Sequence, residues 1–237
     1  MKTAPALPIS LFIILCLGCG GSEPPPKEPE APPPPTRSGP KLQMQTELGQ
    51  IDPAKTDATF KKLQPALMRC YEDGQKRIEF LGGDVKFFLR VQQDGHTKYA
   101  YISEGTLGDR TTERCMLELA MNAAWPQPEG GEAEVQKSIG FDPPGGVRAP
   151  TDWSSDKVRP EVGKHAAELS SCKGGVTGTF HVTAYVAPAG HAGQVTAAGI
   201  SAPSADGEAK SDCLVGVIKK LKLPSPGSYA AKVTFDI

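Results

Sequence analysis

The sequence predicts an α+β fold made of two small tandem domains, each with an antiparallel sheet packed against helices. Three observations lead to this prediction: a repeat with a period of about 100 residues, alternating apolar strands in each copy, and evenly divided cysteines. Cys70 and Cys115 in the first copy correspond to Cys172 and Cys213 in the second. In both copies, the first proline of a Pro-x-Pro pair lies 11 positions after the second cysteine. Matched spacing with little shared identity indicates one fold used twice.

The first helix of copy one is indicated by apolar residues that recur at helical spacing from Phe60 to Tyr71. Thr56 or Asp57 is the expected N-cap. Pro65 lacks an amide donor, so it is expected to kink this helix or to mark the first turn of a shorter one.

The other elements of copy one follow from period-two alternation, turn residues and a second apolar stripe. They are a strand over 85–91, an Asp94-Gly95 turn, a return strand over 97–103, a helix from about Asp109 to Ala124 and a closing strand ending at Phe141. Copy two repeats this order with a helix over 158–172, strands over 180–186 and 194–201, a helix carrying Cys213 and Leu221, and a last strand over 229–237. Each copy is therefore predicted to run helix, strand, strand, helix, strand.

The N-terminal region is typical of a bacterial lipoprotein precursor. The apolar segment 6–18 would cover roughly 20 Å as a helix, which is too short for the ~30 Å core of a bilayer. Cys16-Leu17-Gly18-Cys19 resembles the lipobox, which implies acylation of Cys19 and anchorage in a lipid bilayer. Gly20 follows the anchor in place of Asp, which resembles lipoproteins sorted to the outer membrane, facing the periplasm.

These features divide the chain into five parts. The expected boundaries are a signal peptide at 1–18, a lipid anchor and Pro-rich tether at 19–50, the first domain at 51–142, a linker at 143–150 and the second domain at 151–237. The segment 20–40 should populate extended polyproline II and act as a spacer.

Four stretches of copy one carry a resemblance to a known family. Cys-Tyr-Glu-Asp-Gly at 70–74, the strand up to Asp94-Gly95, the helix around Cys115 and Trp-Pro-Gln-Pro-Glu-Gly-Gly from Trp125 together resemble the AgmX/PglI C-terminal family, which is TonB C-terminal-like. The resemblance covers about residues 56–141 and implies a fold that can receive a strand from a partner protein. Copy two keeps the cysteines and the two prolines but lacks the Tyr and the Trp.

Composition argues against several classes of function. The formal net charge is −1 and no basic run occurs in 41–237, so a nucleic-acid partner is not expected. No two histidines have the i, i+4 spacing of a helical ligand pair, and no pair among Cys70, Cys115, Cys172 and Cys213 has the Cys-x-x-Cys spacing, so neither a metal nor another cofactor is expected. No Gly-x-Ser-x-Gly motif indicates a nucleophile. The acidic pairs Glu113/Glu118 and Asp206/Glu208 are interpreted as solvated helix faces.

The four cysteines of the two copies are expected to form disulfides within each copy, because an exported protein meets an oxidising compartment. A redox or metal-binding role is the less favoured alternative. Each bridge would close a loop of about 45 residues and stabilise its copy by roughly 4 kcal/mol.

The sequence thus favours a non-enzymatic envelope lipoprotein whose tandem domains bind a protein or a peptidoglycan-associated partner, within a motility or envelope complex. The alternative is an envelope hydrolase or transferase with an unrecognised site. Candidate sheet edges for strand addition are residues 195–201 and 229–237, where Lys232 is expected to face outward. Phe88, Tyr99 and Tyr101 could form a contact patch or pair across strands beneath a helix.

Overall fold

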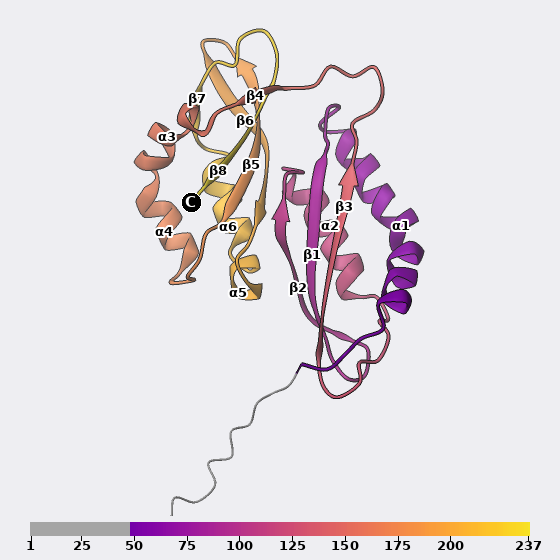
Figure 1. Cartoon of the computed structure of the whole chain (residues 1–237). Coiled ribbons are helices and arrows are strands. Elements are labelled where there is room, and N and C mark those ends of the chain that lie inside the picture. Colours follow the sequence, from indigo (N-terminus) through magenta and orange to yellow (C-terminus); the bar gives the residue numbers. More distant parts are fainter. Residues whose placement is uncertain (1–47) are drawn as a thin grey trace, which may run out of the picture. The chain divides into compact units, whose positions relative to one another are not determined.

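The computed structural model describes residues 48–237 (Figure 1). The predicted signal peptide, the anchor Cys19 and most of the Pro-rich tether lie outside the described residues. The described residues belong to one compact unit of mixed α+β structure with two sheets. The halves expected as separate domains are therefore joined by contacts, although each has its own sheet, apolar core and disulfide.

The first half has the predicted order of elements. They are α1 (Pro53–Gln75), β1 (Gly83–Val91), β2 (Thr97–Gly105), α2 (Arg110–Met121) and β3 (Ala133–Phe141). The strands form an antiparallel sheet in the order β2-β1-β3, and α1 and α2 cover one face of it (Figure 1). The alternation predicted for β1 is confirmed, because Val85, Phe87 and Leu89 are completely buried between the sheet and the helices.

Two details of α1 differ from the prediction. The N-cap is Asp52, whose carboxylate accepts hydrogen bonds from the backbone N–H groups of Ala54 and Lys55. The helix also continues through Pro65 as one 23-residue element. Pro65 is exposed, and the apolar residues on either side of it hold the helix against the sheet.

The second half has more elements than predicted. They are β4 (Thr151–Trp153), the 3₁₀ helix η1 (Ser155–Lys157), α3 (Arg159–Lys164), α4 (Ala166–Lys173), β5 (His181–Ala189), β6 (Ala192–Ser201), α5 (Ala205–Glu208), α6 (Ser211–Ile218), β7 (Lys222–Pro224) and β8 (Ala231–Asp236). The single helix expected over 158–172 is divided because His165 leaves the helical region, with φ −99° and ψ 12°.

The second sheet has the order β4-β8-β5-β6-β7. Its three central strands repeat the arrangement of the first sheet, with β6, β5 and β8 in the places of β2, β1 and β3. β4 pairs in parallel with β8, and β7 pairs with the start of β6. These two short strands have no counterpart among the described residues of the first half.

Both disulfides join the first and second helical regions of the same half. Cys70 pairs with Cys115 at a Cα–Cα distance of 5.9 Å, and Cys172 pairs with Cys213 at 5.5 Å. These are the pairs expected from the sequence.

The halves meet through the face of the second sheet that points away from its own helices. Tyr185 on β5 is completely buried there and belongs to the core of the first half. Its hydroxyl donates to the carbonyl oxygen of Gly82 at 3.1 Å. Arg110 on α2 contacts the carboxylates of Glu208 and Asp212 in the second half. Both faces of this sheet are consequently packed, whereas one face of the first sheet is partly open to solvent.

Candidate functional site

β3 is a nine-residue edge strand that pairs only with β1 within residues 48–237. The opposite edge of the same sheet, β2, meets the second half, where the N–H of Ala202 donates to the carbonyl oxygen of Ile102 at 2.8 Å. The edges of the second sheet, β4 and β7, have three residues each. β3 therefore offers a long strand edge with an unoccupied side in the described part of the chain.

The outward backbone groups of β3 can be identified from β1. The carbonyl of Asp84 accepts from Thr106 N, and its amide donates to the Thr106 hydroxyl, so Asp84 is directed towards β2. Backbone direction alternates along a strand, so Val85 is directed towards its β3 partner Ile139. The even-numbered β3 residues then direct their N–H and C=O groups away from the sheet. They are Glu134, Gln136, Ser138 and Gly140.

An apolar groove of about 330 Å³ runs between α1 and this edge. Buried Phe60 and Leu67 of α1 contribute to its floor, and partly buried Ile139 of β3 lines it. Met68 also lines it and is 37% exposed, which makes it one of the few large apolar side chains open to solvent in the described structure. An edge strand beside such a groove offers backbone pairing along one side and pockets for alternate side chains along the other.

The groove has a charged border. Lys137 Nζ lies 2.8 Å from Asp57 Oδ1 and connects β3 to the first turns of α1. The hydrogen bond and charge of the Lys137 ammonium hold the pKa of Asp57 below its usual range. Both side chains are well exposed, so the pair contributes little stability and can rearrange around a ligand.

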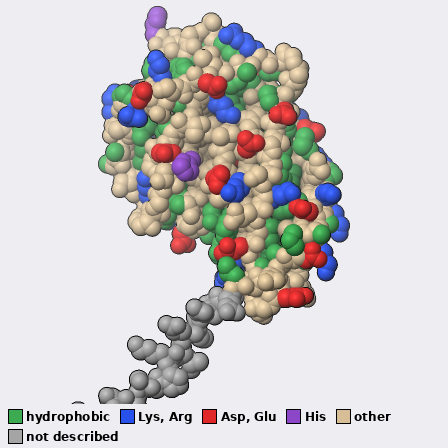
Figure 2. All heavy atoms as spheres, in the orientation of Figure 1, with side chains coloured by type: hydrophobic (Ala, Val, Ile, Leu, Met, Phe, Trp, Pro, Cys, Tyr) green, Lys and Arg blue, Asp and Glu red, His purple; other side chains and the backbone are tan. Residues whose placement is uncertain are grey.

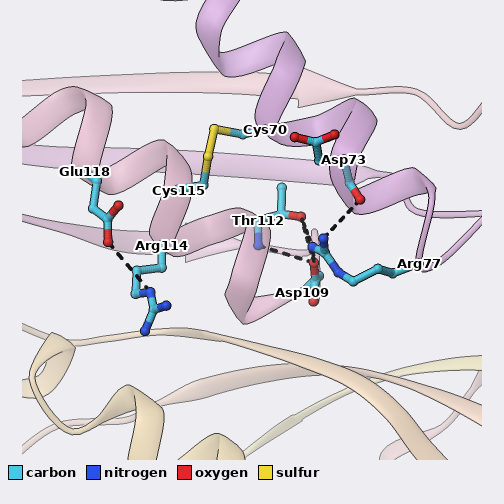
Figure 3. The surroundings of a disulfide bond; sticks show 8 residues. All are labelled: Cys70, Asp73, Arg77, Asp109, Thr112, Arg114, Cys115 and Glu118. Atoms are coloured by element: carbon cyan, nitrogen blue, oxygen red, sulfur yellow. Dashed lines mark hydrogen bonds and ion pairs between the residues drawn. A yellow bond between two sulfur atoms is a disulfide. The ribbon is translucent and has the colours of Figure 1, made fainter.

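The position of α1 is fixed by contacts with α2 at its C-terminal end (Figure 3). Cys70 is bonded to Cys115. Two residues beyond the end of α1, Arg77 donates to the carboxylate of Asp109, the N-cap of α2, and to the carbonyl oxygen of Asp73. These covalent and ionic links hold one wall of the groove in place.

The edges predicted from the sequence are largely occupied. β8, within the predicted segment 229–237, lies between β4 and β5, and β4 pairs with residues 231–233. In the predicted segment 195–201, the N–H of Ile200 donates to Glu113 Oε2 at 3.1 Å. The prediction for Lys232 was wrong, because Lys232 Nζ donates to the Gly82 carbonyl oxygen of the first half at 2.7 Å. Burial lowers the pKa of Lys232.

The aromatic residues of the first sheet pair across strands, but not beneath a helix. Phe88 and Tyr101 are opposite each other in β1 and β2, and their rings stack with centroids 4.8 Å apart. They point away from the face that α1 and α2 cover, since the adjacent residues in their strands, Phe87 and Ile102, are in the core.

Figure 2 shows acidic and basic side chains interspersed on the visible face of the molecule.

Burial strongly perturbs the carboxyl group of Glu113. Its side chain is not on a solvated helix face, as predicted, but is buried between the halves with its residue 4% exposed. Its two oxygens accept hydrogen bonds from the backbone N–H groups of Gly108 and Ile200. Burial raises the pKa of Glu113 to about 7, although the Ile200 N–H and Arg110 oppose this shift. Glu208 of the other acidic pair also contacts Arg110, with a side chain only 13% exposed.

The described residues contain no cluster of three or more His, Cys, Asp or Glu side chains suited to a metal ion. Within residues 48–237, no helix combines the length and the apolar character required to cross a bilayer.

Sequence reasoning placed Phe60, Leu67 and Ile139 on the correct elements but did not identify the groove. The helical and strand periods assign these residues to a core, and the two patterns do not show that a helix lies beside the outer edge of β3. The sequence has no further strand pattern after Phe141 and before the second half. This absence was the available signal that β3 is the last strand of the first sheet. Glu113 gave no such signal, since a buried Glu and an exposed Glu look alike in a helical pattern.

Comparisons with protein-family models, curated proteins and solved structures found no match to this chain.

Proposed function

We propose that this protein is a non-enzymatic lipoprotein of the bacterial cell envelope that binds an extended segment of a partner protein along β3. The observation that supports this function best is the nine-residue β3 edge beside an apolar groove. A partner strand would pair with the outward backbone groups of β3 and insert alternate apolar side chains between β3 and α1. The two halves, with their common strand order, are proposed to be copies of one TonB C-terminal-like fold.

The cellular location in this proposal depends on the N-terminal sequence. Acylated Cys19 would hold the chain at the outer membrane, and the Pro-rich residues 20–40 would separate the folded part from the lipid surface. Two disulfides among the described residues support an oxidising compartment. A partner in a motility or envelope complex, either a protein or one associated with peptidoglycan, is consistent with this location.

The buried carboxyl group is the observation that could favour the alternative, an envelope hydrolase or transferase. A raised pKa near neutrality suits general acid–base catalysis. However, both Glu113 oxygens are engaged by backbone N–H groups, and the residue is 4% exposed. A substrate could not reach this carboxyl group without separating the halves, so we assign Glu113 a structural role.

The proposed site can be tested by photocrosslinking in intact cells. A photoreactive amino acid at Met68 lies in the groove, and the same amino acid at Met121 is the matched control, since Met121 is also 37% exposed but ends α2. We expect partner crosslinks from position 68 and at least fivefold fewer from position 121. Equal crosslinking from both positions would contradict a site in this groove.

A second change tests whether backbone pairing is involved. Gln136→Pro removes one outward N–H and leaves the β1–β3 ladder intact, because edge strands tolerate Pro on their unpaired side. We expect it to reduce crosslinks from position 68 at least fivefold, whereas Gln136→Ala, which keeps the N–H, should leave them unchanged. If both variants fold and crosslink like wild type, strand addition at β3 is wrong.

A further inference from the structure

The groove between α1 and β3 has two distinct ends. α1 and β3 run in the same direction along its sides (Figure 1). In the first turns of α1, Asp57 Oδ1 lies 2.8 Å from Nζ of Lys137 on β3. About four helical turns further along α1, the ring centroid of Tyr71 lies 4.9 Å from that of Phe141, the last residue of β3. One end of the groove is therefore beside Lys137, and the other is beside Phe141.

The end beside Lys137 carries a positive balance of charge. Lys61 lines this end from α1, one turn after Asp57, and is exposed. The hydrogen bond and charge of Lys137, together with the charge of Lys61, hold the pKa of Asp57 below its usual range. These three are the charged residues among the described residues that line the groove. Two ammonium groups against one carboxylate give a formal balance of +1, which attracts an acidic side chain.

The end beside Phe141 is apolar. Leu67 of α1 is buried in its floor, and Met68 and Ile139 also line it. Met68 is 37% exposed and Ile139 is only partly buried, so both keep apolar surface in contact with water. A large apolar side chain that enters this end would remove that surface from water, which drives binding.

A strand that pairs with β3 would reach both ends with alternate side chains. Odd-numbered residues of β3 direct their side chains to the helix side, where Val135 and Phe141 are buried. Residues opposite each other in adjacent strands share a face of the sheet. The partner positions opposite Lys137 and Ile139 are two residues apart, so they lie on the same face. One of them is at the charged end of the groove, and the other is at the apolar end.

A second copy of β3 does not have the pattern that these ends require. Its helix-side residues include Lys137 between Val135 and Ile139, so pairing two β3 edges would place a further lysine in a groove that already holds two. Its acidic residue, Glu134, is even-numbered and lies on the exposed face of the sheet. The charge of the groove therefore opposes a second copy and favours a different chain.

We propose that the segment bound along β3 combines a large apolar side chain with an acidic side chain two positions away. The apolar side chain would lie against Met68 and Ile139, and the acidic one would pair with Lys61. Lys61 is then the residue that selects the charge of the partner, since Lys137 is already bonded to Asp57. This inference rests on the proposed function, because it specifies the kind of sequence that the same site accepts.

Selection of peptides from a displayed library of random heptapeptides on the full mature chain tests the specificity. We expect peptides with Asp or Glu two positions from a large apolar residue to be enriched at least tenfold over those with Lys or Arg there. Lys61→Glu should reverse this preference, because the balance at the charged end changes from +1 to −1. Lys62→Glu is the matched control and should keep the acidic preference, since Lys62 is also exposed but does not line the groove.

Gln136→Pro separates this inference from the proposed function, and the circular dichroism spectrum of each variant confirms that it folds. Enriched peptides that bind Gln136→Pro as well as the wild type would contradict the proposed function itself. Peptides that require the β3 edge but show no charge preference would overturn this inference and leave the proposed function standing. An equal change of preference in Lys61→Glu and Lys62→Glu would overturn it in the same way. Self-association of the chain that Gln136→Pro abolishes would assign the edge to a second copy and would also overturn it.

Discussion

The two halves of the molecule share a strand order but use their sheets differently. In the first half, α1 and α2 cover one face of the sheet, and β3 presents a nine-residue edge. In the second half, both faces are packed, and the sheet ends in the three-residue strands β4 and β7. The comparison shows that sheets with the same central strand order can differ in which faces are packed and how long their edge strands are.

The difference arises from a few side chains at the junction of the halves. The Tyr185 hydroxyl and the Lys232 ammonium group of the second sheet both donate hydrogen bonds to the carbonyl oxygen of Gly82. The corresponding face of the first sheet carries Lys86, Phe88 and Arg90, which are only partly buried. The second half therefore packs against the first half through one face of its sheet. The first half keeps β3 as an edge strand that pairs only with β1 among the described residues.

The largest expected effect concerns the feature that the halves share. Replacing Cys70 and Cys115 by Ala, or Cys172 and Cys213 by Ala, should lower the free energy of unfolding by about 4 kcal/mol in each case. The expected losses are similar because the bridges span 45 and 41 residues. Denaturant unfolding without reductant measures both values. A loss below about 1 kcal/mol for one pair would show that the halves do not depend equally on their bridges.

The junction should make stability depend on pH. Burial raises the pKa of Glu113 from 4.5 to about 7, so the folded chain binds a proton over this range that the unfolded chain has released. The free energy of unfolding should therefore fall as pH rises from about 5 to 8, with about 3 kcal/mol of the fall due to Glu113. Burial also raises the pKa of Glu208, so its contribution has the same sign.

Denaturant unfolding of Glu113→Gln at both pH values isolates the contribution of Glu113. The neutral amide should remove this part of the pH dependence, leaving that of Glu208. An identical pH dependence in the wild type and the variant would show that the Glu113 carboxyl group does not titrate in this range.

A smaller effect is expected at Gly199 on β6. A Cβ atom there would collide with the Glu113 carboxylate, so Gly199→Ala should destabilise the protein by about 1–3 kcal/mol. Gly216→Ala is the control, because a Cβ atom at this exposed position of α6 meets nothing within 4 Å, and Ala favours a helix by up to about 1 kcal/mol. Thermal unfolding of both variants measures the difference. Equal effects would mean that the two halves do not pack closely at Gly199.

The sequence by itself determined the elements of the first half, the main strands of the second half and the cysteine pairing. Alternation defined β1 and β8, and the Asp94-Gly95 turn defined the hairpin between β1 and β2, where Gly95 has a φ of 84°. These features depend on contacts between neighbours in the chain, or on a repeated spacing, and both are visible in a linear pattern.

The tertiary structure alone decided which edge is open and which polar residues are buried. Glu113 and Lys232 have the sequence context of exposed residues, but Glu113 becomes buried and Lys232 partly buried because the other half of the chain packs against them. Among residues 48–237, β3 is an edge because only β1 pairs with it, whereas β8 is covered by β4. The contacts of Glu113 with Ile200 and of Lys232 with Gly82 join residues 87 and 150 positions apart. A local hydrophobic period contains no information about which distant surface supplies the partner.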